Sequence, residues 1–113
     1  MTSGKPLVWL HGEVKTPPFS RAARVEAGFL LRRLQTGEMI GMPDSRPMPA
    51  IGGSCHELRV GDGSTTWRII YAIQPDAVVI LEVFQKKTRT TPPQILETAR
   101  KRLRAYQRAA KGA

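Results

Sequence analysis

Three segments in the second half of the chain alternate apolar and polar residues or form short apolar runs. They cover residues 56–60, residues 66–71 and the stretch from residue 77 to about residue 85. This pattern is typical of β-strands that bury one face. A glycine-rich turn at 61–64 separates the first two segments, and a turn at 74–76 separates the second from the third. Because both connections are short, we predict an antiparallel meander.

Two other segments carry apolar residues at helical spacing, so we predict two amphipathic helices. We expect the first helix to be capped by Ser20 and to end in a left-handed conformation at Gly37. Its apolar face comprises Ala23, Ala27, Leu30, Leu31 and Leu34. We expect the second helix to have Thr91 as its N-cap and Pro92 at its first helical position. Its apolar face comprises Ile95, Leu96, Ala99, Leu103 and Tyr106.

A short apolar run at residues 5–11 predicts one more strand, and the proline- and glycine-rich residues 38–54 predict a connecting loop. The expected order is strand, helix, three-stranded antiparallel meander and C-terminal helix, which is an α/β chain of the α+β type. With 113 residues, of which 41% are hydrophobic, the chain is long enough for one compact domain. We expect this domain to cover residues 1–113, with a core from about residue 6 to residue 108.

The cysteine and histidine content narrows the possible chemistry. Cys55 is the single cysteine, which excludes an intrachain disulfide and favours a reducing compartment. One cysteine and two histidines do not make an ordinary structural zinc site, and the sequence contains no glycine-rich phosphate loop. The apolar runs are too short for a membrane span or a signal peptide. We therefore expect a cytoplasmic protein that uses no metal and no cofactor and does not enter a membrane.

The net charge is the unusual bulk property of the chain. Eighteen lysine and arginine residues against nine acidic residues give a formal charge of +9, and the isoelectric point is near 10.6. Such an excess in a small domain is typical of a nucleic-acid-binding protein or of a protein with an acidic partner. A basic globular protein without such a partner is the alternative.

Two arginines occupy polar positions on adjacent predicted strands. If the first hairpin turns symmetrically about Gly63 and Ser64, Arg59 lies opposite Arg68. Like charges at opposed positions destabilise a sheet by a few tenths to about 1 kcal/mol. A phosphate held between them would offset this cost, because it accepts several charge-assisted hydrogen bonds from guanidinium groups. The alternative is a solvated strand face, and a shift of one residue in the register would separate the pair.

More cations gather after the third strand of the meander. Lys86, Lys87 and Arg89 follow Phe84, whose ring is a candidate for stacking on a nucleobase. A charge run at a strand end is also common on solvated surfaces. Its position on the strand beside that of Arg68 favours a role in binding an anion.

An RNA can be cleaved by its own 2′-hydroxyl without a metal or a protein nucleophile. The reaction needs cations that stabilise the phosphate and groups that move protons. Glu57 and His56, on the first strand of the meander, are candidates for RNA contacts or proton transfer. Simple alternation places His56 on the face opposite to Arg59.

Seven short motifs follow one another between about residue 20 and residue 107. They are Leu34-Gln35-x-Gly37, Gly41-Met42-Pro43, His56-Glu57-Leu58-Arg59-Val60, Trp67-Arg68-Ile69-Ile70-Tyr71, Phe84-Gln85-Lys86-Lys87-Thr88, Thr91-Pro92 and Ala99-Arg100-Lys101-Arg102. Their order and spacing closely resemble the HigB-like branch of the RelE/ParE toxin superfamily, including its phage-derived members.

This resemblance implies a compact RelE-like fold in which an antiparallel sheet carries helices on one face. It implies a type II toxin that cleaves mRNA in the ribosomal A site and is neutralised by a helix-turn-helix antitoxin of the HigA-like kind. Matched position by position, Arg59 and Arg68 correspond to the strand cations that hold the scissile phosphate. Lys87, with Lys86 beside it, corresponds to the cation at the end of the last strand. A tyrosine used by some ribosome-dependent members has no counterpart, so the general base and acid stay unassigned.

Two other functions are consistent with the same sequence. A ParE-like protein would inhibit DNA gyrase by binding, without nuclease chemistry. A basic RNA-binding phage protein would contact RNA without cleaving it. The opposed pair Arg59 and Arg68 favours the RNA endonuclease, because gyrase inhibition needs no centre that grips a phosphate.

Overall fold

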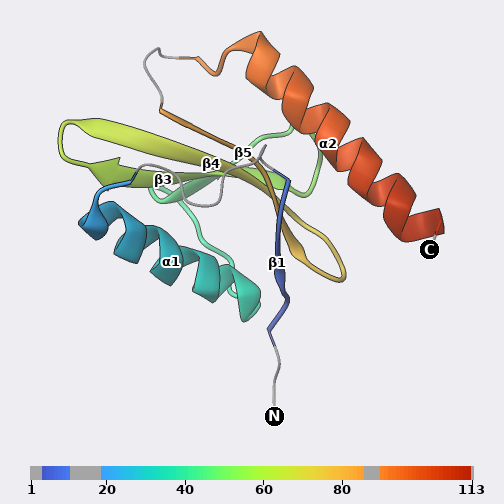
Figure 1. Ribbon diagram of the computed structural model, residues 1–113, viewed down its shortest axis with the longest axis horizontal. Helices are drawn as coiled ribbons and strands as arrows, with labels where there is room; N and C mark the ends of the chain where they lie inside the picture. Colours follow the sequence, from blue (N-terminus) through green and yellow to red (C-terminus); the bar gives the residue numbers. More distant parts are fainter. Residues whose placement is uncertain (1–3, 11–18, 86–89, 113) are drawn as a thin grey trace.

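The structure, a computed structural model, describes residues 4–10, 19–85 and 90–112. Within these residues the helices and strands occur in the predicted order, with one additional strand (Figure 1). The elements are β1 (Leu7–Trp9), α1 (Arg21–Gln35), β2 (Ser45–Pro47), β3 (Cys55–Asp62), β4 (Thr65–Ile73), β5 (Val78–Gln85) and α2 (Pro93–Gly112). The predicted α+β class is therefore confirmed.

A five-stranded sheet forms the middle layer of the molecule, with the strand order β1-β5-β4-β3-β2. β3, β4 and β5 pair antiparallel in sequence order, which confirms the predicted meander. β1 pairs in parallel with the outer edge of β5, so the sheet is mixed. The chain between β1 and β5 includes α1 and the other strands, and a parallel pair requires a long connection of this kind.

β2 lies within residues 38–54, which the sequence pattern predicts as a loop. Residues Ser45–Pro47 pair antiparallel with the outer edge of β3. A strand of three residues is too short to show alternation, and Pro47 is tolerated because it lies at the end of an edge strand. This short strand places Arg46 directly opposite Glu57.

α1 begins and ends as the sequence predicts. The Ser20 hydroxyl accepts a hydrogen bond from the Ala23 amide at 3.1 Å. Gly37 has a φ of 95°, and the Glu38 amide donates to the Arg33 carbonyl at 3.0 Å. This is the Schellman ending of a helix, in which glycine adopts a positive φ without a steric cost.

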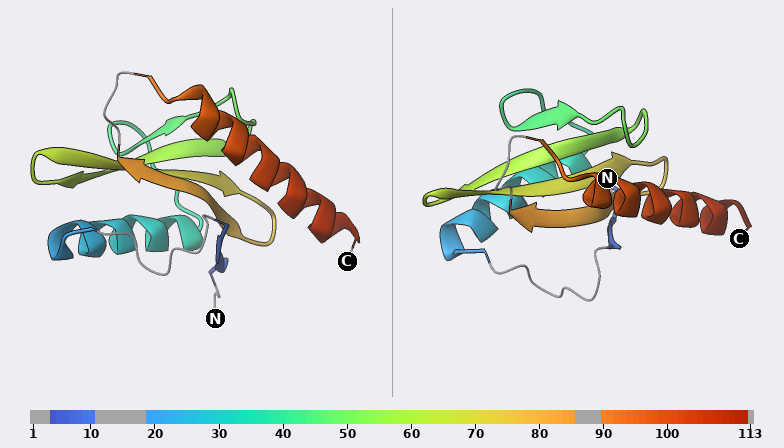
Figure 2. Two further views of the ribbon diagram at one scale, coloured as in Figure 1. Left: turned by 45° about the horizontal axis from the view of Figure 1, so that its top comes forward. Right: turned by 90° about the horizontal axis from the view of Figure 1, so that it is seen from above.

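The two helices cover opposite faces of the sheet, as the two views in Figure 2 show. α1 packs on the face that carries Leu58 and Ile69, whereas α2 packs on the face that carries Ile70 and Leu81. The resemblance implied helices on one face, and this expectation is wrong. Residues 78–81 of β5 are all completely buried, so this strand has two apolar faces and each needs a cover.

α2 begins later than the capping pattern predicts. The carbonyl of Pro92 accepts from the amides of Ile95 and Leu96, at 3.0 and 3.3 Å, so Pro92 occupies the N-cap position. Pro93 is then the first helical residue, where a missing amide hydrogen costs nothing. The Thr91 hydroxyl is buried and finds no hydrogen-bond partner in the described part of the chain. The prediction of Thr91 as N-cap is therefore wrong.

Cys55 lies in the core on the α2 side of the sheet and is 1% exposed. Burial raises the pKa of its thiol from 9.0 to about 11. At about pH 8 roughly one thiol in a thousand is then ionised, so we expect iodoacetamide to modify the folded protein very slowly. We expect rapid modification after unfolding in urea, and mass spectrometry measures both rates. Rapid modification of the folded protein would contradict this account.

The same shift makes the stability of the fold depend on pH at the alkaline end. The pKa of the Cys55 thiol is higher in the folded protein than in the unfolded chain. Between about pH 9 and pH 11 the unfolded chain therefore releases this proton before the folded protein does. The contribution is constant below this window, and stability falls as the pH rises through it.

Candidate anion-binding site

Arg59 and Arg68 lie directly opposite each other on β3 and β4, as the symmetric hairpin predicts. On the neighbouring strand, β5, Phe84 pairs with Arg68. Ile70 is two residues from Arg68 on the same strand and belongs to the core beneath α2. Because strand residues alternate between faces, this row of two guanidinium groups and one aromatic ring lies on the α2 side of the sheet.

Glu57 holds two arginine side chains from the strands on either side of it. Its Oε1 atom accepts hydrogen bonds from Nε of Arg46 and from Nη1 of Arg68, each at 3.1 Å. Both contacts are ion pairs, and the Glu57 side chain is completely buried. The residues Arg46, Glu57, Arg59 and Arg68 are called the arginine cluster below.

The arginine cluster has more positive charge than its carboxylate neutralises, because three guanidinium groups face one carboxylate. Within the described residues, Arg59 forms no ion pair. The Nε atoms of Arg59 and Arg68 and the Oε2 atom of Glu57 are buried and have no hydrogen-bond partner among these residues. A buried donor without an acceptor costs free energy. An anion that enters the cluster would supply acceptors for the two Nε donors, though not a donor for Oε2 of Glu57.

The environment of Arg68 shows how poorly its charge is solvated. Burial lowers the pKa of the Arg68 guanidinium, the Glu57 carboxylate opposes this shift, and the charges of Arg59 and Arg46 reinforce it. A guanidinium nevertheless stays protonated in proteins. Arg68 is therefore a permanent cation that gains from contact with an anion, and a phosphate offers several oxygen atoms in the geometry that guanidinium groups prefer.

The arginine cluster is open to solvent at its rim. The side chain of Arg46 is 33% exposed and that of Arg68 is 12% exposed, so a ligand can reach both. Phe84, the candidate for base stacking, is half-buried and lies beside Arg68. These residues form a candidate phosphate site with an aromatic ring next to it.

His56 lies on the other face of the sheet and does not join the arginine cluster. It pairs with Tyr71, and the two rings stack with their centroids 5.5 Å apart. Tyr71 belongs to the core on the α1 side. This is the placement that strand alternation predicts for His56.

Three predicted site residues, Lys86, Lys87 and Arg89, lie outside the described residues. Arg46 is not among the residues that the sequence predicts for the site, although the structure places it in the cluster. Its position in a proline-rich stretch without periodicity gave no signal for a strand. Only the pairing of β2 with β3 brings it to Glu57.

The described part of the chain contains neither a group of metal ligands nor a helix that could span a membrane. No three His, Cys, Asp or Glu side chains gather there in a group that could hold a metal ion. Among the helices described, none combines the length and the apolar character that crossing a membrane requires.

Comparison with protein families identifies the family to which the chain is similar. A family model described as "Phage derived protein Gp49-like (DUF891)" matches residues 18–104. None of the curated proteins compared with this chain matches it. The matched span contains α1, the strands β2 to β5 and about half of α2, and it therefore includes the whole arginine cluster.

Proposed function

Because the chain belongs to the phage-derived Gp49-like family, we propose that it is the toxin of a type II toxin–antitoxin pair and that it cleaves mRNA on the ribosome. The observation that carries this proposal is the arginine cluster, in which Arg59 and Arg68 face each other and their buried Nε atoms have no hydrogen-bond partner among the described residues. Keeping two like charges opposed in a sheet is unfavourable without an anionic ligand. The net charge of +9 fits an RNA ligand as well.

The proposed reaction is the attack of an RNA 2′-hydroxyl on the adjacent phosphorus. The bond between the 2′-oxygen and phosphorus forms while the bond to the 5′-oxygen breaks, one proton leaves the 2′-hydroxyl and one is delivered to the 5′-oxygen. Arg59 and Arg68 would stabilise the charge that develops on the phosphate oxygens. Lys87, two residues after the end of β5, is proposed as a third cation at the phosphate.

Glu57 has a supporting part in this proposal. Its two ion pairs fix Arg46 and Arg68 at positions from which their remaining donors can meet the substrate. Phe84, beside Arg68, is proposed to stack on a base next to the scissile phosphate. The partners proposed are the ribosome with its mRNA and a helix-turn-helix antitoxin, whose acidic residues would complement the basic surface.

Mapping the 5′ ends of mRNA after brief expression tests the proposed function. We expect new ends inside open reading frames, in phase with ribosomal codons, together with arrest of translation and growth. A variant with Arg68→Ala and Lys87→Ala serves as the inactive control. Intact mRNA together with induction of the DNA-damage response would instead support gyrase inhibition and would overturn the nuclease proposal.

A further inference from the structure

The second half of α2 presents a row of cations to solvent. Lys101, Arg104, Arg108 and Lys111 are all exposed, and their spacing of three, four and three residues places them on one face of the helix. The buried residue Leu103 lies on another face of α2, toward the sheet. In Figures 1 and 2 the C-terminal end of α2 extends beyond the sheet. We call these four residues the α2 stripe.

The α2 stripe differs from the other two cations of this helix. Arg100 donates to the Ala50 carbonyl, and Arg102 donates to the Leu81 carbonyl and forms an ion pair with Glu82. These two side chains fasten α2 to the rest of the protein. The four side chains of the α2 stripe form no hydrogen bond or ion pair with other side chains in the described part of the chain. Their charge is therefore available for a ligand.

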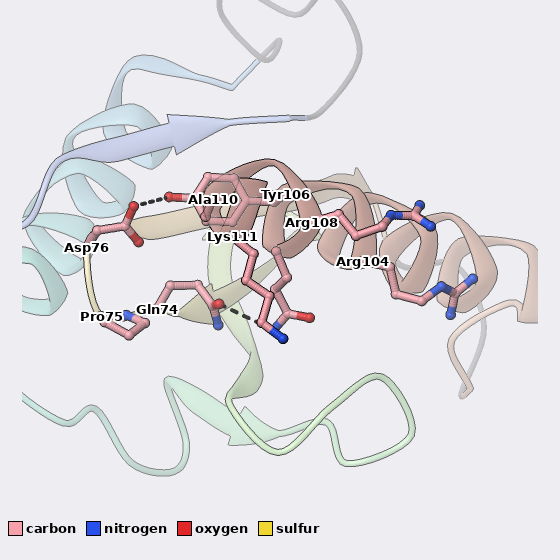
Figure 3. A pocket seen from close by; sticks show the side chains of 9 residues that line it. Gln74, Pro75, Asp76, Arg104, Tyr106, Arg108, Ala110 and Lys111 are labelled. Carbon is pink, nitrogen blue, oxygen red and sulfur yellow. Dashed lines mark hydrogen bonds between the residues drawn. The ribbon is translucent and has the colours of Figure 1, made fainter. Parts of the chain in front are cut away.

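A groove of about 720 Å³ runs beside the α2 stripe, between the last turns of α2 and the turn that joins β4 to β5 (Figure 3). Pro75, Tyr106 and Ala110 line it together with Arg104 and Arg108 of the stripe. The hydroxyl of Tyr106 donates to Asp76 at 2.8 Å, which fixes the ring and uses the nearby carboxylate. An extended ligand can therefore lie along the stripe on a concave surface.

We propose that the α2 stripe binds the phosphate backbone of RNA, as a contact separate from the arginine cluster. All four side chains of the stripe are cations, and charged residues are depleted at the centre of protein–protein interfaces, so the stripe suits a polyanion better than a protein partner. A phosphate backbone requires only cations at suitable spacing. Ten residues of helix span about 15 Å, which matches several consecutive phosphates of one strand.

This inference rests on the proposed function only for the choice of RNA as the ligand. Two contacts on one chain would let the α2 stripe hold an RNA while the arginine cluster acts on one phosphate. The surface of α1 offers a comparison, since Arg21, Arg24 and Arg32 are also exposed but lie on the opposite side of the sheet. Removing three charges there changes the net charge by the same amount.

The experiment measures the affinity of the full chain for a short single-stranded RNA whose 2′-hydroxyls are methylated, so that it cannot be cleaved. Fluorescence anisotropy at several salt concentrations compares the wild type with R104A/R108A/K111A and with the control R21A/R24A/R32A. We expect the α2 variant to bind at least about tenfold more weakly at physiological salt and to lower the salt slope by about two. The control should change affinity less than about twofold.

If both variants lost the same RNA affinity, the effect would depend on net charge alone and the proposal would be overturned. Unchanged affinity in R104A/R108A/K111A would also overturn it. Cleavage of mRNA on ribosomes by the wild type, measured beside RNA binding, separates this proposal from the proposed function. If RNA binding depends on the α2 stripe but the wild type cuts no mRNA on ribosomes, the proposed function fails and the α2 contact stands. If the wild type cuts mRNA while the α2 variant binds the methylated RNA normally, only the α2 contact fails.

Discussion

Replacing Arg59 with alanine is expected to abolish growth arrest and to slow mRNA cleavage by about 10²–10³-fold, the loss typical of removing one donor from a charged transition state. Arg59 forms no ion pair within the described residues, and its buried Nε atom has no partner there. Its removal therefore breaks no ion pair of the described residues and leaves no hydrogen bond of its Nε atom unmade. It also relieves the repulsion with the opposed Arg68, so the stability of R59A should equal that of the wild type or exceed it by a few tenths of a kcal/mol.

Cleavage of mRNA on purified ribosomes, followed by primer extension, measures the loss in R59A, and thermal unfolding measures the stability. R32A is a matched control, because Arg32 is an exposed arginine on the opposite side of the sheet. R59K should retain part of the activity, since lysine keeps the charge but not the planar fork of donors. A folded R59A protein that cleaves mRNA at the wild-type rate would remove the arginine cluster from the mechanism.

Local patterns in the sequence predict most of the helices and strands of the fold. The serine cap of α1, the glycine at its end and the turn about Gly63 each depend on a few neighbouring residues, and the structure contains all three. What the sequence did not reveal depends on contacts between distant segments. β2 exists because residues 45–47 find the edge of β3, and α2 takes its own face of the sheet because both faces of β5 are apolar.

In the candidate site, too, the sequence predicts what depends on neighbouring residues and does not predict contacts between distant segments. The pairing of Arg59 with Arg68 follows from a short hairpin, so counting from the turn was sufficient to predict it. Arg46 lies opposite Glu57 only because β2 pairs with β3. No periodicity in the sequence predicts that β2 exists. Composition also does not show that Glu57 is buried and forms ion pairs with Arg46 and Arg68. A buried carboxylate is costly unless charged groups of this kind pair with it.

Replacing Glu57 with alanine is expected to lower the free energy of unfolding by about 2–4 kcal/mol and to abolish cleavage. Glu57 is completely buried and pairs with Arg46 and Arg68, so its loss leaves three guanidinium groups without a carboxylate. Urea unfolding followed by circular dichroism measures the change. E38A is the matched control: Glu38 pairs with Arg33 at the surface, where the expected loss is below about 1 kcal/mol. Equal losses in E57A and E38A would contradict the argument.

Replacing both Glu57 and Arg68 separates the contribution of their ion pair to stability from its contribution to cleavage. A buried pair that is exchanged for apolar side chains of similar volume often loses little stability, whereas the loss of one partner is costly. E57M/R68M should therefore be more stable than the sum of the two single changes predicts, with a coupling of about 1–3 kcal/mol. Cleavage should nevertheless be absent, because a thioether in place of the Arg68 guanidinium would offer the phosphate no donor. If the double variant restored both stability and cleavage, the pair would serve packing alone; stability without cleavage would mean that the charges are kept for the anion.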